Sequence, residues 1–297
     1  MSAKNSIKKS SFLNLGTLYA WPMGVWFTIF FLAPLVIILV YSFLKKGLYG
    51  GVEWEFSIQA YKQMINPAYG VVLVRTIWIS AISTIITILI ALPCGYAIAK
   101  SKHQIVFLIL IIVPFLTNSL IRIFAWMSIL GNNGVLNSIF IGLGITKDHF
   151  NLLYNTGTVI TVSIYMYLPY AILPIFTAVD RFDFSLLEAS RDLGSTKIES
   201  MIKVLMPNVK SGVVTAFIFT FIPLFGSYTV PLLVGGKDSY MLGNIIVDQV
   251  NKTRNWPLAA SFALILTLIS TIGVLWMMFT GKEDTVAKRK KTEGDIA

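Results

Sequence analysis

Long apolar runs dominate this chain, and polar residues are confined to short stretches between them. A helix that crosses the hydrocarbon core of a bilayer needs about 20 mostly apolar residues. The runs do not alternate every second residue, as the strands of a membrane barrel do. The pattern therefore predicts six transmembrane helices, at residues 19–44, 76–99, 105–130, 158–179, 211–234 and 257–280.

Prolines recur inside these runs. In lipid they are tolerated where neighbouring helices cover the freed carbonyl groups, so the runs predict kinked helices packed in a bundle. The fifth run contains three helix-disrupting residues close together, Pro223, Gly226 and Pro231. They predict that the helix of this run is interrupted. The other prolines inside the runs are Pro34, Pro93, Pro114, Pro169 and Pro174.

Composition agrees with an integral membrane protein. Hydrophobic residues make up 56% of the 297 residues, charged residues 13%, and the mean hydropathy is +0.74. A soluble globular chain carries about 25% charged residues, so a soluble, disordered or collagen-like chain is excluded. The first run is too long for a cleaved signal peptide, and no small-x-small cleavage site follows it.

The distribution of basic residues predicts an orientation. With the N-terminus inside, 15 of the 24 Lys and Arg residues lie in inner segments and eight in outer segments. Cytoplasmic segments of membrane proteins are enriched in Lys and Arg, so both termini are expected in the cytoplasm. The predicted organisation is a cytoplasmic N-terminal tail at 1–18, a six-span domain at 19–280 and a basic cytoplasmic tail at 281–297. The basic run at 288–291 is interpreted as an orientation and lipid-headgroup feature, with no nucleic acid partner.

Residues with metal or redox chemistry are few. The single cysteine, Cys94, lies inside an apolar run and is expected to be a small buried side chain. His103 and His149 are 46 positions apart and have no cysteine partners, so no metal site is predicted. Arg122 is the one charge within the runs; it either snorkels or caps carbonyl groups, or it lines a path.

The longest inner loop, 180–207, has the pattern of a folded element. Ser185 and Glu188 have the spacing of a capping box, although Glu188 could serve only as a cap. Gly194 follows, where a left-handed turn ends a helix. One face of this first helix is formed by Leu186, Ala189, Ser190 and Leu193.

A second helix is predicted to begin at Thr196, which repeats the capping spacing with Glu199. It carries Ile198, Met201, Ile202 and Leu205, and it is expected to stop before Pro207. Two interpretations remain open. The helix pair either lies on the lipid surface, or it binds a cytoplasmic partner and transmits the movement of that partner to the two adjoining spans.

This loop resembles the EAA motif of binding-protein-dependent ABC importer permeases. That motif runs E-A-A, three residues, G, nine residues, I-x-L-P, and the chain has Glu188-Ala189-Ser190, Gly194 and Val204-Leu205-Met206-Pro207. The departures at Ser190, Val204 and Met206 are similar in size to the motif residues. The resemblance implies ATPase coupling through Leu186, Glu188, Ala189, Ser190, Leu193, Gly194 and Pro207.

Further segments are similar to the permeases of spermidine/putrescine importers, and closest to the first of the two permease subunits in those systems. They are residues 113–122, 131–137, 187–194, 233–236 and 254–257. The resemblance implies an all-α, six-helix type I ABC importer permease fold (MetI-like) with a cytoplasmic coupling helix, in a bacterial inner membrane. It also implies a second permease, a cytoplasmic ATPase dimer and an extracytoplasmic binding protein as partners.

The sequence contains no phosphate-binding loop, nucleophile elbow, HExxH or CxxC motif. The chain is therefore predicted to be a transport subunit and not an enzyme. It is expected to bind no cofactor, with ATP and Mg²⁺ bound by the partner ATPase.

Substrate selectivity is only weakly encoded. A polyamine is a flexible polycation, for which acidic or aromatic walls are expected, yet the six runs contain no Asp or Glu. Candidates for the path are Tyr165, Tyr167 and Tyr228, which could equally pack or form an interfacial belt, and Asp248, which could be a solvated charge. Residues 240–251 predict a shallow helix at the pore mouth or facing the binding protein.

The predicted function is ATP-driven polyamine import, with ferric iron or an organic anion as alternative substrates. An ion-coupled secondary transporter is a further alternative. The lack of an intramembrane carboxylate and the structured loop count against it.

Overall fold

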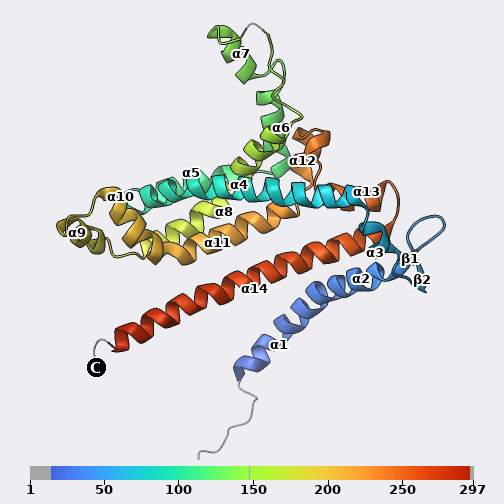
Figure 1. Cartoon of the computed structure of the whole chain (residues 1–297), viewed down its shortest axis with the longest axis horizontal. Coiled ribbons are helices and arrows are strands. Elements are labelled where there is room, and N and C mark those ends of the chain that lie inside the picture. The colour runs from blue at the N-terminus through green and yellow to red at the C-terminus, as the bar shows by residue number, and fades with distance from the viewer. Residues whose placement is uncertain (1–14, 147, 295–297) are drawn as a thin grey trace, which may run out of the picture.

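The computed structural model describes residues 15–146 and 148–294, and most of them are helical (Figure 1). Within this part of the chain, five helices are long and apolar enough to cross a membrane, and there are six spans when the bent pair Gln104–Phe115 and Ser119–Gly142 is counted as one. The prediction of six spans is confirmed, with one of them broken. The orientation prediction counted four lysines that lie outside the described residues: Lys4, Lys8, Lys9 and Lys147. Residues 1–14 of the predicted N-terminal tail and 295–297 of the predicted C-terminal tail also lie outside them.

The first run folds as α1 (Leu15–Phe27), a π-helical turn η1 (Thr28–Leu32) and α2 (Ala33–Ser42). The helix ends at Ser42 and not at residue 44, because Leu44 enters a strand. That strand, β1 (Leu44–Lys46), pairs antiparallel with β2 (Val52–Phe56). The hairpin was not predicted, although Gly50 and Gly51 between the strands take the positive φ angles that its turn needs (96° and 78°).

The second span is longer than predicted. After a short helix α3 (Gln59–Met64), helix α4 (Pro67–Ala99) begins nine residues before the predicted start at residue 76. Asn66 caps it by accepting a hydrogen bond from the backbone N–H of Ala68, and Pro67 occupies the first helical position. Both residues are favoured at a helix start, so the helix extends beyond its apolar part.

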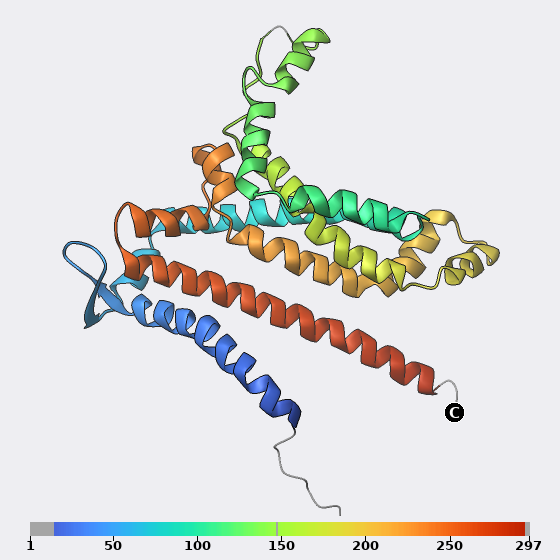
Figure 2. The ribbon, with the colours of Figure 1, turned by 180° about the vertical axis from the view of Figure 1, so that it is seen from behind.

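The prediction of one continuous helix at 105–130 is wrong. The run forms α5 (Gln104–Phe115) and α6 (Ser119–Leu130), which continues into α7 (Val135–Gly142). The segments Gln104–Phe115 and Ser119–Gly142 meet at 87°. Asn118 accepts a hydrogen bond from the N–H of Leu120 and so starts a new helix just after Pro114. Both views show α6 and α7 projecting away from the other helices (Figures 1 and 2).

The fourth span, α8 (Thr156–Asp180), matches its prediction closely. The fifth, α11 (Met206–Phe225), is interrupted at Gly226 as predicted and is followed by α12 (Thr229–Val234). After the turn η3 (Lys237–Ser239), α13 (Leu242–Asn251) confirms the short helix predicted at 240–251. Helix α14 (Trp256–Gly294) runs beyond residue 280 and includes most of the predicted basic tail.

The helices form two layers. Helices α4, α8 and α11 pack against one another, whereas α14 packs along α2 (Figure 1). The layers meet where α14 contacts α11 and α13. Between α8 and α11, a Cβ atom on Gly212 would lie 2.8 Å from the carbonyl oxygen of Pro174, so only glycine allows this close approach. Cys94 is half-buried and packs against the same core.

Candidate coupling loop and transport face

The loop between α8 and α11 folds into the two short helices that the sequence predicted. They are α9 (Ser185–Asp192) and α10 (Lys197–Ser200), at one end of the helical layer (Figure 1). Gly194 between them has φ = +90°. Its N–H donates to the carbonyl of Arg191 at 2.8 Å, and the N–H of Ser195 donates to the carbonyl of Ser190 at 3.1 Å. The left-handed turn at Gly194 is confirmed.

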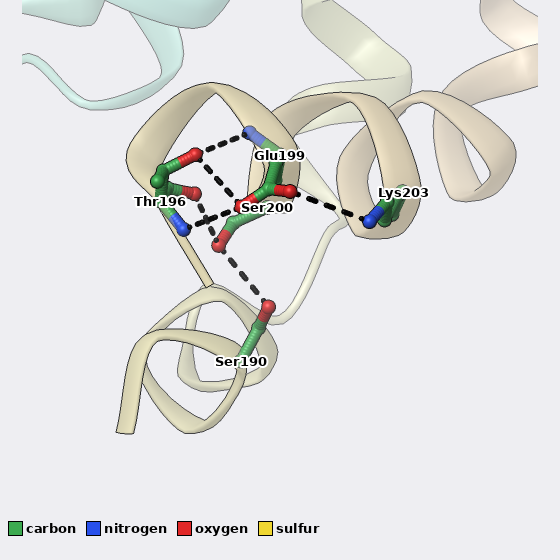
Figure 3. Close-up of polar contacts among 5 residues, drawn as sticks. All are labelled: Ser190, Thr196, Glu199, Ser200 and Lys203. Carbon is green, nitrogen blue, oxygen red and sulfur yellow. Dashed lines mark hydrogen bonds and ion pairs between the residues drawn. The ribbon is translucent and has the colours of Figure 1, made fainter. Parts of the chain in front are cut away.

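The second capping box is confirmed, and the first is not formed. The N–H of Glu199 donates to Thr196 Oγ1 at 3.3 Å, and the N–H of Thr196 donates to Glu199 Oε2 at 3.0 Å (Figure 3). At α9, the carboxylate of Asp183 instead accepts from the N–H of Ser185 at 3.0 Å. Hydrogen bonds from the Ser185 side chain and backbone hold the pKa of Asp183 below its ordinary value. The Glu188 side chain is left exposed.

The prediction that the second helix stops before Pro207 is wrong. Helix α10 continues through a π-helical turn η2 (Met201–Leu205) into α11 without a break. In this wider turn, the N–H of Met206 donates to the carbonyl of Met201, five residues back. The turn directly precedes a proline, which cannot donate a hydrogen bond and would crowd the carbonyl four residues back in a regular helix. The loop is therefore joined rigidly to the fifth span.

The two helices of the loop are tied by a pair of serines. Ser190 Oγ lies 3.1 Å from Ser200 Oγ, and Ser200 Oγ also donates to the carbonyl of Thr196 at 3.0 Å (Figure 3). Ser200 is fully buried. On the outside of α10, Lys203 Nζ lies 3.5 Å from Glu199 Oε1. The contact between the two serines ties α9 to α10, whereas the other two contacts lie within the second helix.

The loop has one buried and one exposed apolar face. Leu187 and Leu205 belong to the core cluster that also contains Val179 of α8 and Val209 of α11. Leu186 and Leu193, on the predicted face of α9, are 47% and 88% exposed. Ile198 and Ile202 of the second helix are exposed as well. We call Leu186, Leu193, Ile198 and Ile202 the exposed apolar edge.

The tyrosines predicted for a transport path do not form one site. Tyr165 makes an edge contact with Trp126 of α6, with ring centroids 5.5 Å apart. Tyr167 donates to the carbonyl of Pro223 on α11 at 3.4 Å. Tyr228 lies at the start of α12, where its carbonyl accepts from Asn244 Nδ2 at 2.9 Å. Two positions on α8 that are two residues apart thus meet different neighbours.

Asp248, the predicted acidic candidate, lies on α13 and is paired with residues just outside both ends of that helix. Its carboxylate lies 2.8 Å from Lys252 Nζ and accepts a hydrogen bond from the hydroxyl of Tyr240. Burial disfavours the charge of Asp248, but the bonds from Lys252 and Tyr240 outweigh it and lower the pKa. Burial, reinforced by the bond to Asp248, raises the pKa of Tyr240 to about 12. The negative charge of Asp248 is therefore matched by Lys252, the residue that follows α13.

Two features of this region were not predicted from the sequence. The first is a stack in which the guanidinium of Arg122 lies 4.4 Å from the ring centroid of Phe115, and Phe115 meets Tyr170 at 4.8 Å. Arg122 thus covers the bend between α5 and α6. Its interaction could not be inferred from the sequence, because the bend that brings α6 back over Phe115 was not predicted.

The second feature is a groove of about 540 Å³ between α8 and α11, directly beside the coupling loop. Polar residues from both helices line it, among them Thr177, Arg181, Asn208, Ser211 and Thr215. Asn208, Ser211 and Thr215 fall on one helical face, which is a sequence signal that could have indicated this surface.

A helical membrane domain with a two-helix loop between its fourth and fifth spans is the architecture that the resemblance to ABC importer permeases implies. The chain belongs to the family of binding-protein-dependent transport system inner membrane components, whose pattern matches residues 74–279.

Relatives of this family resemble most of the chain. It is 28% identical over 270 residues to the spermidine/putrescine transport system permease protein PotB of Escherichia coli, covering 90% of this chain and 98% of that protein. It is 32% identical over 249 residues to PotB of Haemophilus influenzae, covering 83% and 87%. A chain of a bacterial ABC transporter involved in the import of the acidic polysaccharide alginate has the same fold, with a TM-score of 0.74 and 13% identity over 90% of this chain and 96% of that chain.

Proposed function

We propose that this chain is the permease subunit of an ATP-driven importer that moves a polyamine, spermidine or putrescine, into the cytoplasm. ATP and Mg²⁺ bind to a separate cytoplasmic ATPase dimer. A second, homologous permease completes the path, and an extracytoplasmic binding protein delivers the substrate. The complex resides in a bacterial inner membrane.

The exposed apolar edge of the coupling loop carries this proposal. Four large apolar side chains exposed on one short loop indicate a contact with a partner or with lipid. The opposite face of the loop is packed into the core through Leu187 and Leu205. A partner that grips the edge would therefore move α8 and α11 with it, which is what an ATPase needs in order to drive this bundle.

The placement of the chain ends supports a cytoplasmic location for the loop. The end of α14 and the loop helices lie toward the same end of the molecule, while the hairpin and α13 lie at the other, and α1 starts about midway between them (Figures 1 and 2). The basic bias of the sequence puts both termini inside. The loop then faces the ATPase, and α13 faces the binding protein.

Similarity to the PotB proteins supports the polyamine substrate. The six predicted runs contain no carboxylate, so they offer the cation no strong counter-charge. Aromatic rings such as those of Tyr167 and Tyr170, whose centroids are 6.0 Å apart, can hold an ammonium group by cation–π contact. Weak contacts suit a path that must release its cargo, and selectivity then belongs mainly to the binding protein.

The mechanism follows from the rigidity of the loop. When the ATPase dimer closes, α9 and α10 move as one body because Gly194, the Thr196–Glu199 box and the serine pair fix their geometry. Helices α8 and α11 follow, and the bundle changes between inward-facing and outward-facing states. The ATPase thus biases a two-state element to which it binds differently in each state.

Uptake of labelled spermidine or putrescine tests the proposal in cells that express the chain with its neighbouring subunits. Saturable uptake that either polyamine inhibits, and that ferric iron or an organic anion does not, is the expected result. Uptake of iron or of an anion in place of a polyamine would overturn the substrate.

The variant Leu193→Asp tests the coupling role, with Leu193→Met as its matched control. Residue 193 is exposed, so neither change disturbs the core. A charge at the centre of an apolar contact should release the ATPase during purification and abolish uptake, while methionine should retain both. Normal uptake by Leu193→Asp would show that this edge does not dock the ATPase.

A further inference from the structure

A cavity lies at the end of the molecule opposite the coupling loop, where the β1–β2 hairpin meets the turn between α13 and α14 (Figure 1). Its volume is about 450 Å³. It is lined by Tyr49, Gly50, Gly51, Val250, Asn251, Arg254 and Trp256. These residues include one cation and no acidic residue. We call this space the hairpin cavity.

The cation of the hairpin cavity, Arg254, is held in place through its backbone. The N–H of Gly51 donates to the carbonyl of Arg254 at 2.9 Å. A Cβ atom on Gly50 would lie 2.5 Å from Cβ of Arg254, so the hairpin turn rests directly on this residue. Arg254 has φ = +48°, a left-handed conformation that is uncommon for a residue other than glycine. The fold therefore fixes the base of an arginine side chain at this position.

The positive charge of Arg254 is available to a ligand. The residue is exposed, and its guanidinium takes part in none of the ion pairs within the described part of the chain. A guanidinium presents several N–H donors in a planar fork that matches the oxygens of a phosphate group. The hairpin cavity can therefore receive a phosphate or a similar anion.

A second hollow lies deeper along the same part of the molecule, between α2 and α14. Its volume is about 210 Å³, and all but one of its lining residues are aliphatic. They are Leu32, Leu35, Val36, Ile38, Leu39, Leu264 and Thr267. The most apolar part of the first span, within Trp21–Ser42, has no buried residue, so this side of the molecule is open to lipid. We call the hollow the α2–α14 groove.

The hairpin cavity and the α2–α14 groove lie along one face of α14. Trp256 lines the cavity, and Leu264 and Thr267 of the groove follow it by eight and eleven residues, a spacing that keeps all three on one helical face. The ring of Trp256 also stacks on Tyr41 of α2, with centroids 6.3 Å apart, and Tyr41 is two residues from Leu39 of the groove.

The depth of the groove fits one leaflet of a bilayer. At 1.5 Å per residue, Leu264 and Thr267 lie about 12 and 16 Å along α14 from Trp256. Half of a bilayer, with its headgroup region, is about 20 Å thick. A phospholipid whose headgroup lies at the level of Trp256 therefore reaches the groove with an acyl chain.

The chemistry of the two hollows matches the two ends of such a molecule. Tyr49 and Trp256 are residue types that gather at the membrane–water interface, and Arg254 lies beside them. Because the cavity lining contains no carboxylate, it has no partner for the ammonium group of a zwitterionic headgroup. The lining thus favours a lipid with a net negative charge.

We propose that the hairpin cavity and the α2–α14 groove together bind one anionic phospholipid. Its phosphodiester faces Arg254, and one of its acyl chains occupies the groove. The lipid then joins α2, α14 and the hairpin, and it stabilises the layer that stands apart from α4, α8 and α11. This inference depends neither on the transported substrate nor on the contact with the ATPase.

Lipid titration of the assembled importer tests the proposal. The complex is purified in detergent and freed of lipid, and its thermal unfolding is followed as phosphatidylglycerol, phosphatidylethanolamine or inorganic phosphate is added. Phosphatidylglycerol should raise the melting temperature at the lowest concentration, and inorganic phosphate, which has no acyl chain, should not raise it. Equal effects of the two lipids, or stabilisation by inorganic phosphate alone, would overturn the proposal.

Variants of Arg254 separate this site from a general attraction of anionic lipid to a basic protein. Arg254→Gln should raise the phosphatidylglycerol concentration for half-maximal stabilisation roughly fivefold, the contribution of one cation at a membrane surface. Arg254→Lys keeps the charge and should retain most of the affinity. The matched control is Lys46→Gln, which removes an exposed cation of the hairpin that does not line the cavity. Equal shifts in Arg254→Gln and Lys46→Gln would contradict the site.

A phosphatidylglycerol with a photoreactive group midway along an acyl chain tests the groove in the assembled importer. Adducts should form at the groove residues, disappear in Leu264→Trp, which fills the groove, and persist in Leu268→Trp. Leu268 is 50% exposed and does not line the groove, so it is the matched control. Equal labelling of both variants would overturn the proposal. Absence of labelling in the parent complex would also overturn it, because another chain would then cover the groove.

Discussion

The hydroxyl oxygens of Ser190 and Ser200 lie 3.1 Å apart across the turn that joins the two helices of the coupling loop. Ser190 stands where the family motif has its second alanine, so this polar tie comes with the departure from the motif. Ser200 is fully buried and keeps a second hydrogen bond to the carbonyl of Thr196. The departure therefore adds a contact to the docking element without leaving a buried hydroxyl unsatisfied.

Ser190→Ala restores the motif residue and should be mild. It removes one hydrogen bond, with a cost of about 0.5–1.5 kcal/mol in unfolding free energy, because Ser200 retains Thr196. Thermal unfolding of the purified complex and uptake measure the two effects. Complete loss of uptake at normal protein levels would contradict this role for the serine pair.

Gly194 should tolerate asparagine better than valine. An added Cβ would meet nothing within 4 Å, so any cost comes from the positive φ of the backbone. Asparagine enters the left-handed region with little strain, whereas a β-branched residue does not. Gly194→Val is expected to reduce ATPase-coupled uptake strongly and Gly194→Asn only weakly. Equal activity of the two variants would show that the turn geometry is not required.

Gly212→Leu should destabilise the bundle by about 1–3 kcal/mol, because a side chain there forces α8 and α11 apart. Gly70→Leu, at a position where a Cβ meets nothing within 4 Å, is the matched control and should leave the melting temperature nearly unchanged. Similar melting temperatures for both leucine variants would contradict the close contact at Gly212.

Asp248 should make stability depend on acid pH. Its pKa is lower in the folded chain than its ordinary value, so its contribution is present above the unfolded pKa of about 3.9 and is lost as pH falls through the folded pKa. Asp248→Asn should therefore melt earlier than the parent at pH 7, and the gap should narrow as the pH falls below the unfolded pKa of about 3.9. A gap that is constant with pH would contradict the ion pair with Lys252.

Uptake by Asp248→Asn tests separately whether this carboxylate also lies on the transport path. Because Lys252 and Tyr240 already match its charge, we expect the loss of stability to exceed the loss of uptake. A large rise in the substrate concentration needed for half-maximal uptake, with normal stability, would place Asp248 on the path.

Local patterns predicted much of this fold. The apolar runs predicted the number of spans. The spacing of Gly194, Thr196 and Glu199 predicted the turn between the two helices of the coupling loop and the start of the second helix. The errors arose where a local backbone hydrogen bond or helical turn gave a different structure from the one that the pattern predicted. Asn118 starts a new helix within an apolar run, Asp183 caps α9 in place of Ser185, and a π-helical turn allows the helix to pass Pro207.

The transport face could not be predicted in the same way. Tyr165 and Tyr167 are equivalent in the sequence, but α6 and α11 give them different neighbours. The links from Gln104 to Asp180 and from Lys100 to Phe184 join residues far apart in the chain. Contacts of this kind depend on the packing of whole helices, which no local pattern encodes.

Photo-cross-linking from position 193 in the assembled importer tests the central claim most directly. A photoreactive residue replaces Leu193 on the exposed apolar edge, and the same residue replaces Leu110, an exposed position of α5, as the control. The account predicts an adduct with the ATPase subunit from position 193 and none from position 110. Adducts with lipid alone at position 193, in a complex that retains its ATPase, would contradict it.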